Sequence, residues 1–265
     1  MARGFVSIWR AVGLGLGGLA MLALVPAPAR AAELKALVAG AVRDVVKDLA
    51  DEHTKATGVK ADLFFGAMGP LKAKIVAGER VDLVILTPVV FKEMIESGKL
   101  QVKYRAPLGQ VGMGVAVKKG VAHPNLSTTD AFRKALLDTP SLIYGDPKAT
   151  SSGAYFAKVI AKLGLADELR SKTKIFPDGH EEMAYLGKSE GMVIGVTQIS
   201  EVLANRSAGV EMVGPFPTDL QSYTVYEAAV LSNAPSPEEA KAFFDRLVSK
   251  PAQVRFGAMG FEAVK

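Results

Sequence analysis

The chain has 265 residues, of which 32 are basic and 27 acidic, for a formal net charge of +5 at pH 7. No run of basic residues is interleaved with aromatic residues, so nucleic acid is not expected as a partner. Cysteine is absent, which excludes disulfides and a cysteine-linked lipid anchor. The one tryptophan, Trp9, is close to the N-terminus. Sugar or aromatic ligands, which usually need broad rings to pack against, are therefore disfavoured.

Residues 1–31 have the pattern of a cleavable secretory signal peptide. A basic start with Arg3 and Arg10 precedes an uncharged apolar run from Ala11 to Val25, and Ala-x-Ala cleavage sites then end at Ala29 and Ala31. The apolar run is shorter than the ~20 residues that a membrane-spanning helix needs. We therefore expect cleavage after Ala31, with cleavage after Ala29 as the alternative. The product expected is a soluble monomer in the periplasm.

Short apolar strands alternate with amphipathic helices along the rest of the chain. In chain order, strands are predicted at residues 34–39, 60–65, 82–86, 115–117, 141–144, 174–176, 192–196 and 223–231. Helices are predicted at 42–54, 71–77, 91–97, 129–137, 152–163, 181–188 and 237–248, with a short helix after Pro251. Gly58, Gly78 and Gly98 are placed where the first three helices must stop. This alternation predicts an α/β fold with mainly parallel sheets flanked by helices.

The spacing of these elements allows either one nine-stranded sheet or two lobes. Residues 109–116 and 223–231 are extended stretches at matching places in the pattern. If the chain passes from one lobe to the other at the first stretch and returns at the second, the fold has two lobes joined by two linkers.

Three loops that follow predicted strands are candidates for a ligand site, because open parallel sheets bind ligands at the carboxyl ends of their strands. These loops are Ala39–Arg43, Gly66–Pro70 and Thr150–Gly153. Their small residues let backbone N–H groups approach a ligand, and a helix N-terminus favours an anion. Three consecutive hydroxyls followed by glycine exceed what N-capping needs, whereas the two glycine-rich loops fit tight turns as well as ligand contact.

Arg43 is placed in the first turn of a predicted helix, where its charge opposes the helix dipole by typically ~0.3–1 kcal/mol. A bidentate contact with a carboxylate or phosphate group of a ligand offsets that cost. The alternative is a surface arginine paired with a nearby acid.

Motifs for catalysis or metal binding do not stand out. His53, His123 and His180 form no metal constellation. The run His180-Glu181-Glu182 is interpreted as a solvated helix start, since adjacent helical side chains point in different directions. No nucleophile–base triad, phosphate-binding glycine–lysine pattern or paired-carboxylate motif is found. We therefore expect no enzyme activity, no catalytic residue, no metal and no cofactor.

Several segments together resemble the periplasmic molybdate-binding proteins of ABC importers, which have the type 2 solute-binding fold. The segments are Phe64–Gly69 with Val76–Leu83, Gly145–Pro147 with Ser152–Tyr155, Met192–Val196, and Gly260-Phe261. The resemblance covers the whole chain after the signal peptide. It implies two lobes joined by two crossovers, with residues 32–112 and 226–265 in lobe I and residues 113–225 in lobe II.

The resemblance implies that the chain captures a small anion, such as a molybdate-like oxyanion, between its lobes for an ABC permease in the inner membrane. The residues expected to hold the anion are Gly40, Ala41, Arg43, Ala67, Met68, Ser151, Ser152, Gly153 and Thr197. The family typically has serine hydroxyls where this chain has Ala41 and the Ala67-Met68 pair, and a tyrosine where it has Thr197. A small carboxylate, bound for import or for presentation to a sensor, is therefore the alternative ligand.

Overall fold

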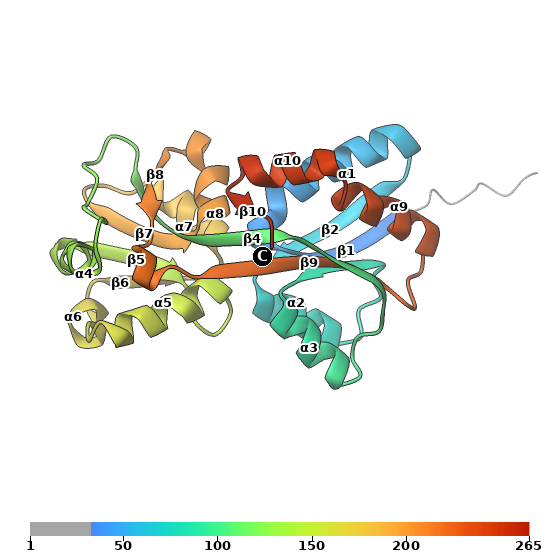
Figure 1. Cartoon of the computed structure of the whole chain (residues 1–265), viewed down its shortest axis with the longest axis horizontal. Coiled ribbons are helices and arrows are strands. Elements are labelled where there is room, and N and C mark those ends of the chain that lie inside the picture. The colour runs from blue at the N-terminus through green and yellow to red at the C-terminus, as the bar shows by residue number, and fades with distance from the viewer. Residues whose placement is uncertain (1–32, 265) are drawn as a thin grey trace, which may run out of the picture. The chain divides into compact units, whose positions relative to one another are not determined.

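The computed structural model describes residues 33–264, and the signal peptide predicted at residues 1–31 lies outside them (Figure 1). The strands are β1 (Glu33–Ala39), β2 (Lys60–Gly66), β3 (Leu83–Leu86), β4 (Val102–Lys118), β5 (Ser141–Gly145), β6 (Thr173–Phe176), β7 (Val193–Gln198), β8 (Val210–Pro215), β9 (Tyr223–Leu231) and β10 (Phe261–Glu262). The α-helices are α1 (Arg43–Thr57), α2 (Met68–Val76), α3 (Pro88–Glu96), α4 (Thr129–Asp138), α5 (Ser151–Lys162), α6 (Ala166–Arg170), α7 (Gly179–Leu186), α8 (Ile199–Ala204), α9 (Pro237–Leu247) and α10 (Lys250–Ala258). Short 3₁₀ turns are η1 (Gly40–Val42), η2 (Arg206–Ala208) and η3 (Thr218–Leu220).

The strands form one hydrogen-bonded path in the order β2-β1-β3-β9-β4-β7-β5-β6, with β8 and β10 also paired to β4. Within this path β1 runs parallel to β2 and β3, and β5 runs parallel to β6 and β7. The long strand β4 is antiparallel to β9 over Val102–Gly112 and to β7 over Met113–Ala116. The α/β prediction is confirmed, with a mixed sheet in which β4 connects two parallel groups.

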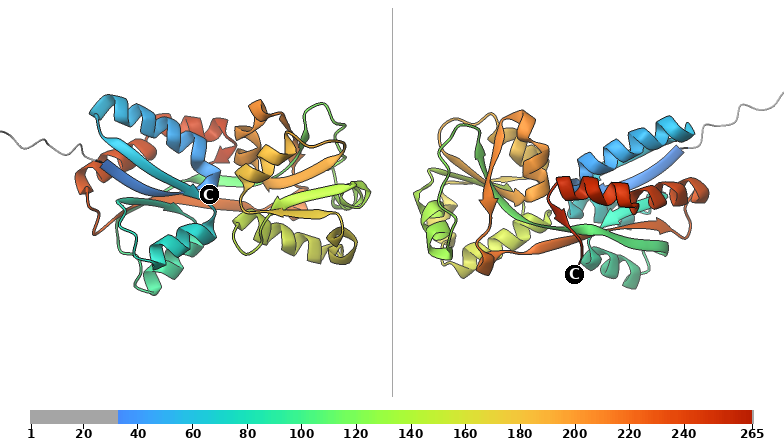
Figure 2. Two further views of the ribbon diagram at one scale, coloured as in Figure 1. Left: turned by 180° about the vertical axis from the view of Figure 1, so that it is seen from behind. Right: turned by 45° about the horizontal axis from the view of Figure 1, so that its top comes forward.

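The buried hydrophobic residues form three clusters along this continuous sheet, which make up two cores. The first core is one cluster from residues 34–111 and 226–261, and the second core comprises two clusters from residues 113–220. We call the elements around these cores the first half and the second half. Figures 1 and 2 show β4 and β9 running between the halves, with helices on both faces of each. The lobe boundaries at 112/113 and 225/226 remain a proposal that the positions of the cores support.

Most elements predicted from the sequence are present. The elements that were not predicted have weak local sequence patterns. The glycine stops are correct, since Gly58, Gly78 and Gly98 follow α1, α2 and α3 with φ of 77°, 77° and 69°. The prediction missed β8, β10, α6, α8 and the first part of β4. That part of β4 is largely exposed and carries charged residues and a proline, so it lacks the alternating apolar pattern of a half-buried strand. The helices α6 and α8 have only 5 and 6 residues, too few to show a helical period.

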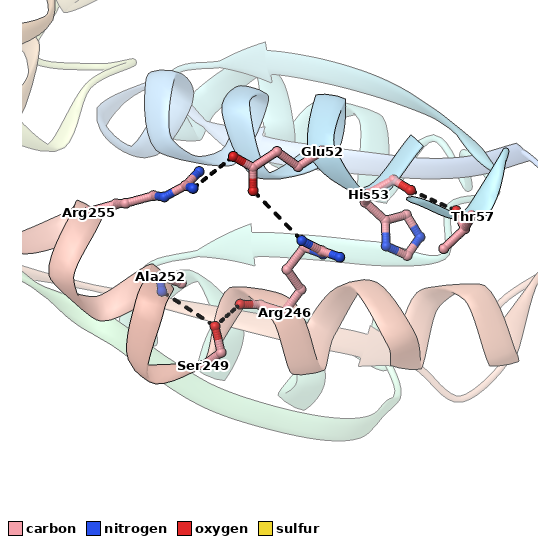
Figure 3. A network of polar contacts seen from close by, with 7 residues as sticks. All are labelled: Glu52, His53, Thr57, Arg246, Ser249, Ala252 and Arg255. Carbon is pink, nitrogen blue, oxygen red and sulfur yellow. Dashed lines mark hydrogen bonds and ion pairs between the residues drawn. The ribbon is translucent and has the colours of Figure 1, made fainter. Parts of the chain in front are cut away.

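A polar network fixes α1 against the C-terminal helices of the first half (Figure 3). The Glu52 carboxylate accepts a hydrogen bond from Arg255 at 2.7 Å and lies 3.7 Å from Arg246. Next to it, His53 is 2% exposed and its ring packs against Phe243. These contacts anchor the body of the helix whose first residue is Arg43. Within residues 33–264, no helix is both long and apolar enough to cross a membrane.

Candidate functional site

A small cavity lies where the two halves meet, with a volume of ≈ 20 Å³. The first half contributes the loops after β1 and β2, and the second half contributes the starts of α5, α7 and α8. Its lining residues are Gly40, Ala41, Gly66, Ala67, Met68, Thr150, Ser151, Ser152, Asp178, Gly179, Gln198, Glu201 and Tyr226. We call it the central cavity. Six of the nine residues expected to hold the anion line it: Gly40, Ala41, Ala67, Met68, Ser151 and Ser152.

Helix N-termini from both halves point at the central cavity. The helices α2 and α5 begin at Met68 and Ser151, and α7 begins at Gly179, all three in its lining. The unpaired N–H groups and the partial positive charge at such ends favour an anion. Where α2 meets the loop before α5, the Gly69 N–H donates to the Ala149 carbonyl at 3.0 Å, which joins the two halves at the rim.

The start of α5 divides its hydroxyl groups between capping and the cavity. Thr150 is the N-cap, because its Oγ1 accepts the Gly153 N–H at 3.0 Å and donates to the Asp146 carbonyl at 3.0 Å. The cap uses neither the Ser151 nor the Ser152 hydroxyl. Thr150 alone therefore caps the helix, and Ser151 and Ser152 line the central cavity. The N–H of Gly153 is already used by the cap.

Arg43 lines an adjoining cavity of ≈ 10 Å³, together with His180 and Ser200. Its guanidinium carbon is 4.8 Å from the centre of the Phe65 ring, and its Nε is buried without a hydrogen-bond partner in the described part of the chain. No acid among residues 33–264 forms an ion pair with it, so the alternative of a surface arginine paired with an acid is wrong. Glu201 lines both this cavity and the central cavity, as do Gly40 and Ala41.

The Glu201 carboxyl is packed between a glycine of each half. A β-carbon at Gly179 would lie 2.3 Å from its Oε2, and one at Gly40 would lie 3.5 Å from its Oε1. Thr197, which is fully buried, donates its hydroxyl hydrogen to Oε2 at 2.5 Å. Burial raises the pKa of Glu201 to about 7 against the opposing effect of the Thr197 hydrogen bond; Asp178 raises it further and Arg43 lowers it. The carboxyl therefore exchanges a proton near neutral pH.

Glu182 places a second carboxyl behind Glu201. The solvated helix start expected for His180-Glu181-Glu182 is wrong at Glu182, which is 0% exposed, although His180 and Glu181 are exposed. Its Oε1 accepts the Val196 N–H at 3.0 Å, and its Oε2 has no partner in the described part of the chain. Burial and the nearby Glu201 carboxyl raise the pKa of Glu182 well above its ordinary value. One helical turn thus carries an exposed acid and a buried one, because Glu182 faces the sheet.

The residues that the sequence did not indicate are Asp178, Gly179, Glu182, Gln198, Glu201 and Tyr226. Asp178 followed by glycine is a recognisable N-cap signal, and its Oδ1 indeed accepts the Glu181 N–H at 2.9 Å. The others carry no local signal, since chain segments far apart in the sequence bring them together. Thr197 is beside the central cavity, but its hydroxyl is directed to Glu201. Among residues 33–264, no group of three or more metal-ligating side chains is assembled.

Comparison with known proteins identifies the family. The model of a family described as bacterial extracellular solute-binding protein matches residues 34–262. The chain belongs to this family. Membership makes it a solute-binding protein of the ABC-transporter type, which implies a small ligand and an ABC permease as partner.

Two relatives and one solved structure describe what this solute-binding protein is similar to. An aconitate isomerase from Pseudomonas sp. is 28% identical over 87% of this chain and 88% of its own. The molybdate-binding protein ModA of Escherichia coli (strain K12) is 28% identical over 86% of this chain and 88% of its own. The periplasmic molybdate-binding protein of Azotobacter vinelandii superposes with a TM-score of 0.71 at 17% identity, covering 88% of this chain and 100% of the other. The resemblance and the type 2 binding-protein fold predicted from the sequence are thereby confirmed.

Proposed function

We propose that this solute-binding protein captures a small organic carboxylate at the central cavity and delivers it to its permease. The observation that carries the proposal is the Arg43 guanidinium, which forms no ion pair among residues 33–264 and has a buried Nε without a hydrogen-bond partner there. It lines the cavity that adjoins the central cavity at Glu201. A guanidinium presents a planar fork of N–H donors that matches a carboxylate in bidentate geometry. The hydroxyls of Ser151 and Ser152, on the opposite wall, suit a second anionic group of the same ligand.

The molybdate-like oxyanion expected from the resemblance has less support from the side chains at the site. On the first half, Ala41 and Ala67 supply no hydroxyl where the molybdate-binding proteins typically have serine. Each cavity holds little more than one water molecule, so the halves must separate to admit either ligand.

Calorimetry with aconitate, citrate, succinate, molybdate and sulfate tests the proposal. We expect one of the carboxylates to bind, and Arg43→Ala to weaken that binding by about 10- to 150-fold through loss of a charged hydrogen bond. Ser152→Ala should weaken it about 5- to 150-fold if the hydroxyl makes the contact. Arg170→Ala, which removes an exposed arginine far from the cavity, is the matched control and should leave affinity unchanged. Tight molybdate binding that is indifferent to Arg43→Ala would contradict the proposal.

The setting for this binding is the periplasm, after removal of residues 1–31. N-terminal sequencing of the protein from a periplasmic extract should begin at Ala32 or within two residues of it. Recovery of the uncleaved chain in the membrane fraction contradicts export of this kind.

A second candidate function is isomerisation of an unsaturated polycarboxylate, and the proton exchange of Glu201 favours it. A general base works best when its pKa is near the working pH, and that of Glu201 is about 7. In such a reaction the Glu201 carboxylate removes a proton from the CH₂ carbon next to the double bond. The double bond shifts, and the same proton returns to its far carbon, so no other reactant is needed. The aconitate isomerase among the relatives is named for a reaction on such a compound.

Proton NMR of aconitate incubated with the protein separates the two functions. Isomerisation would convert one geometric isomer into the other, and Glu201→Gln would abolish conversion while calorimetry still detects binding. If aconitate binds but stays unconverted by the wild type over many hours, the protein binds its ligand without turning it over.

A further inference from the structure

Gln198 ends β7 beside Thr197 and presents an amide that is only half satisfied. The residue is 2% exposed and lines the central cavity. Its Oε1 accepts a hydrogen bond from the Tyr226 hydroxyl at 2.8 Å, whereas its Nε2 is buried and has no partner among residues 33–264. Buried donors without partners are rare in folded proteins. The free Nε2 is therefore placed to donate to a ligand rather than to another part of the chain.

Tyr226 fixes which way this amide points. It belongs to β9 of the first half, is 3% exposed, and packs against Phe261 with ring centroids 6.2 Å apart. Burial raises the pKa of Tyr226, with the nearby Glu201 carboxyl as a second cause, so the hydroxyl keeps its proton. If the amide were reversed, the tyrosine oxygen would accept from Nε2 and the buried hydroxyl proton would lose its acceptor. Tyr226 therefore holds Oε1 towards itself and leaves Nε2 unpaired, on a residue that lines the central cavity.

We propose that Gln198 determines specificity at this site by donating Nε2–H to an unprotonated carboxylate oxygen of the ligand, with Tyr226 as the positioning residue. The inference rests on the proposed function, because it requires a carboxylate in the central cavity. A carboxylate oxygen only accepts hydrogen bonds, so it pairs with Nε2, whereas an ammonium group at the same place, which only donates, leaves Nε2 unpaired. The donor comes from the second half and its positioning group from the first, so the pair forms only when the halves are together.

The double variant Gln198→Leu/Tyr226→Phe tests the donor without leaving a polar group unpaired. Replacing both partners of a buried hydrogen bond by apolar groups of similar shape is nearly neutral for folding. We expect a wild-type circular dichroism spectrum and thermal midpoint, with affinity for the carboxylate probe of the calorimetric screen weakened by about 10- to 100-fold. A folded double variant that binds this probe with wild-type affinity overturns the inference.

Gln198→Glu gives a readout that a merely structural role would not change. At pH 8 the ionised glutamate repels a carboxylate, and affinity should fall by more than about 100-fold. At lower pH the protonated glutamate carries an O–H donor at nearly the same place, so affinity relative to the wild type should recover. Tyr226→Phe, which keeps the donor but frees its orientation, should weaken binding by a few fold. Gln253→Glu, at an exposed glutamine of α10, is the matched control and should show neither effect.

Failure of the inference and failure of the proposed function give different results. If aconitate, citrate and succinate all fail to bind the wild type, the proposed function fails and takes the inference with it. If one of them binds and the Gln198→Glu affinity shows no recovery on acidification relative to the wild type, only the role of Gln198 is overturned.

Discussion

The two halves of the central cavity offer a ligand opposite kinds of chemistry. The first half lines the cavity with the small residues Gly40, Ala41 and Ala67, and its Arg43 lines the adjoining cavity. The second half presents side chains, namely the hydroxyls of α5, the Gln198 amide, and the carboxyls of Asp178 and Glu201. Charge is therefore divided, with the cation on one side and the acids on the other. A ligand that bridges the halves must accept hydrogen bonds from both, and it must tolerate a carboxyl that is protonated only part of the time.

The largest effect is expected from a change in the packing of the first turn of α5, which supports the hydroxyls of the second half. A β-carbon at Gly153 would lie 2.0 Å from the Gly145 carbonyl oxygen, which is backbone and has little room to move. Gly153→Ala should therefore lower the free energy of unfolding by about 4 kcal/mol. Gly257→Ala is the control, because nothing lies within 4 Å of its added carbon, and replacing a helical glycine there should stabilise by up to ~1 kcal/mol. Equal urea midpoints for the two variants would contradict the packing assigned to Gly153.

Lowering the pH should raise the free energy of unfolding, because Glu201 in the second half is buried. Its pKa is raised from 4.5 to about 7 on folding, so its contribution to stability is present below pH 4.5 and is lost as pH rises through 7. Between pH 8 and pH 5 the unliganded wild type should gain about 2.5 kcal/mol relative to Glu201→Gln. Urea unfolding of both proteins at the two pH values measures the difference. If the two change in parallel, Glu201 is not held in the buried position described.

Adding a hydroxyl to the first half tests the difference between the halves, because both sides of the cavity then carry a neutral side-chain donor. Ala41→Ser places a neutral donor where molybdate-binding proteins typically have serine. It should raise the affinity for molybdate by about fivefold, which corresponds to one hydrogen bond of ~1 kcal/mol. Ala73→Ser, on the exposed side of α2, is the control. Unchanged molybdate affinity in Ala41→Ser calorimetry would mean that this position does not face the ligand.

The smallest expected effect concerns the anchoring of the first half. Glu52→Gln weakens the contacts with Arg246 and Arg255 shown in Figure 3, which are partly exposed, and should cost about 0.5–1 kcal/mol. Asp167→Asn breaks the more exposed pair with Arg170 and should cost less. The loss for Glu52→Gln should shrink in 1 M salt, because salt screens exposed charges. Carboxylate affinity should stay unchanged, since the network supports α1 without touching the cavity.

The sequence predicts the fold well because its strands and helices have strong local signals. Buried strands such as β3 and β9, and glycine stops such as Gly58, need no long-range information. At the site, the loops were predictable from their small residues and hydroxyls. The acids were not, because burial decides the roles of Glu182 and Glu201 and depends on contacts between distant segments. The pairing of Tyr226 with Gln198 spans the two halves and leaves no trace in either local pattern.

The shared strand β4 also has a consequence for how the protein folds. It is the neighbour of β9 in one half and of β7 in the other, so neither core has a complete sheet without it. Heat or urea should therefore unfold residues 33–264 in a single cooperative transition rather than in two steps, since melting one half exposes an edge of the other. A fragment that contains only one half would present an unpaired strand edge, which invites aggregation. The two halves are thus expected to fold cooperatively, even though a ligand must enter between them.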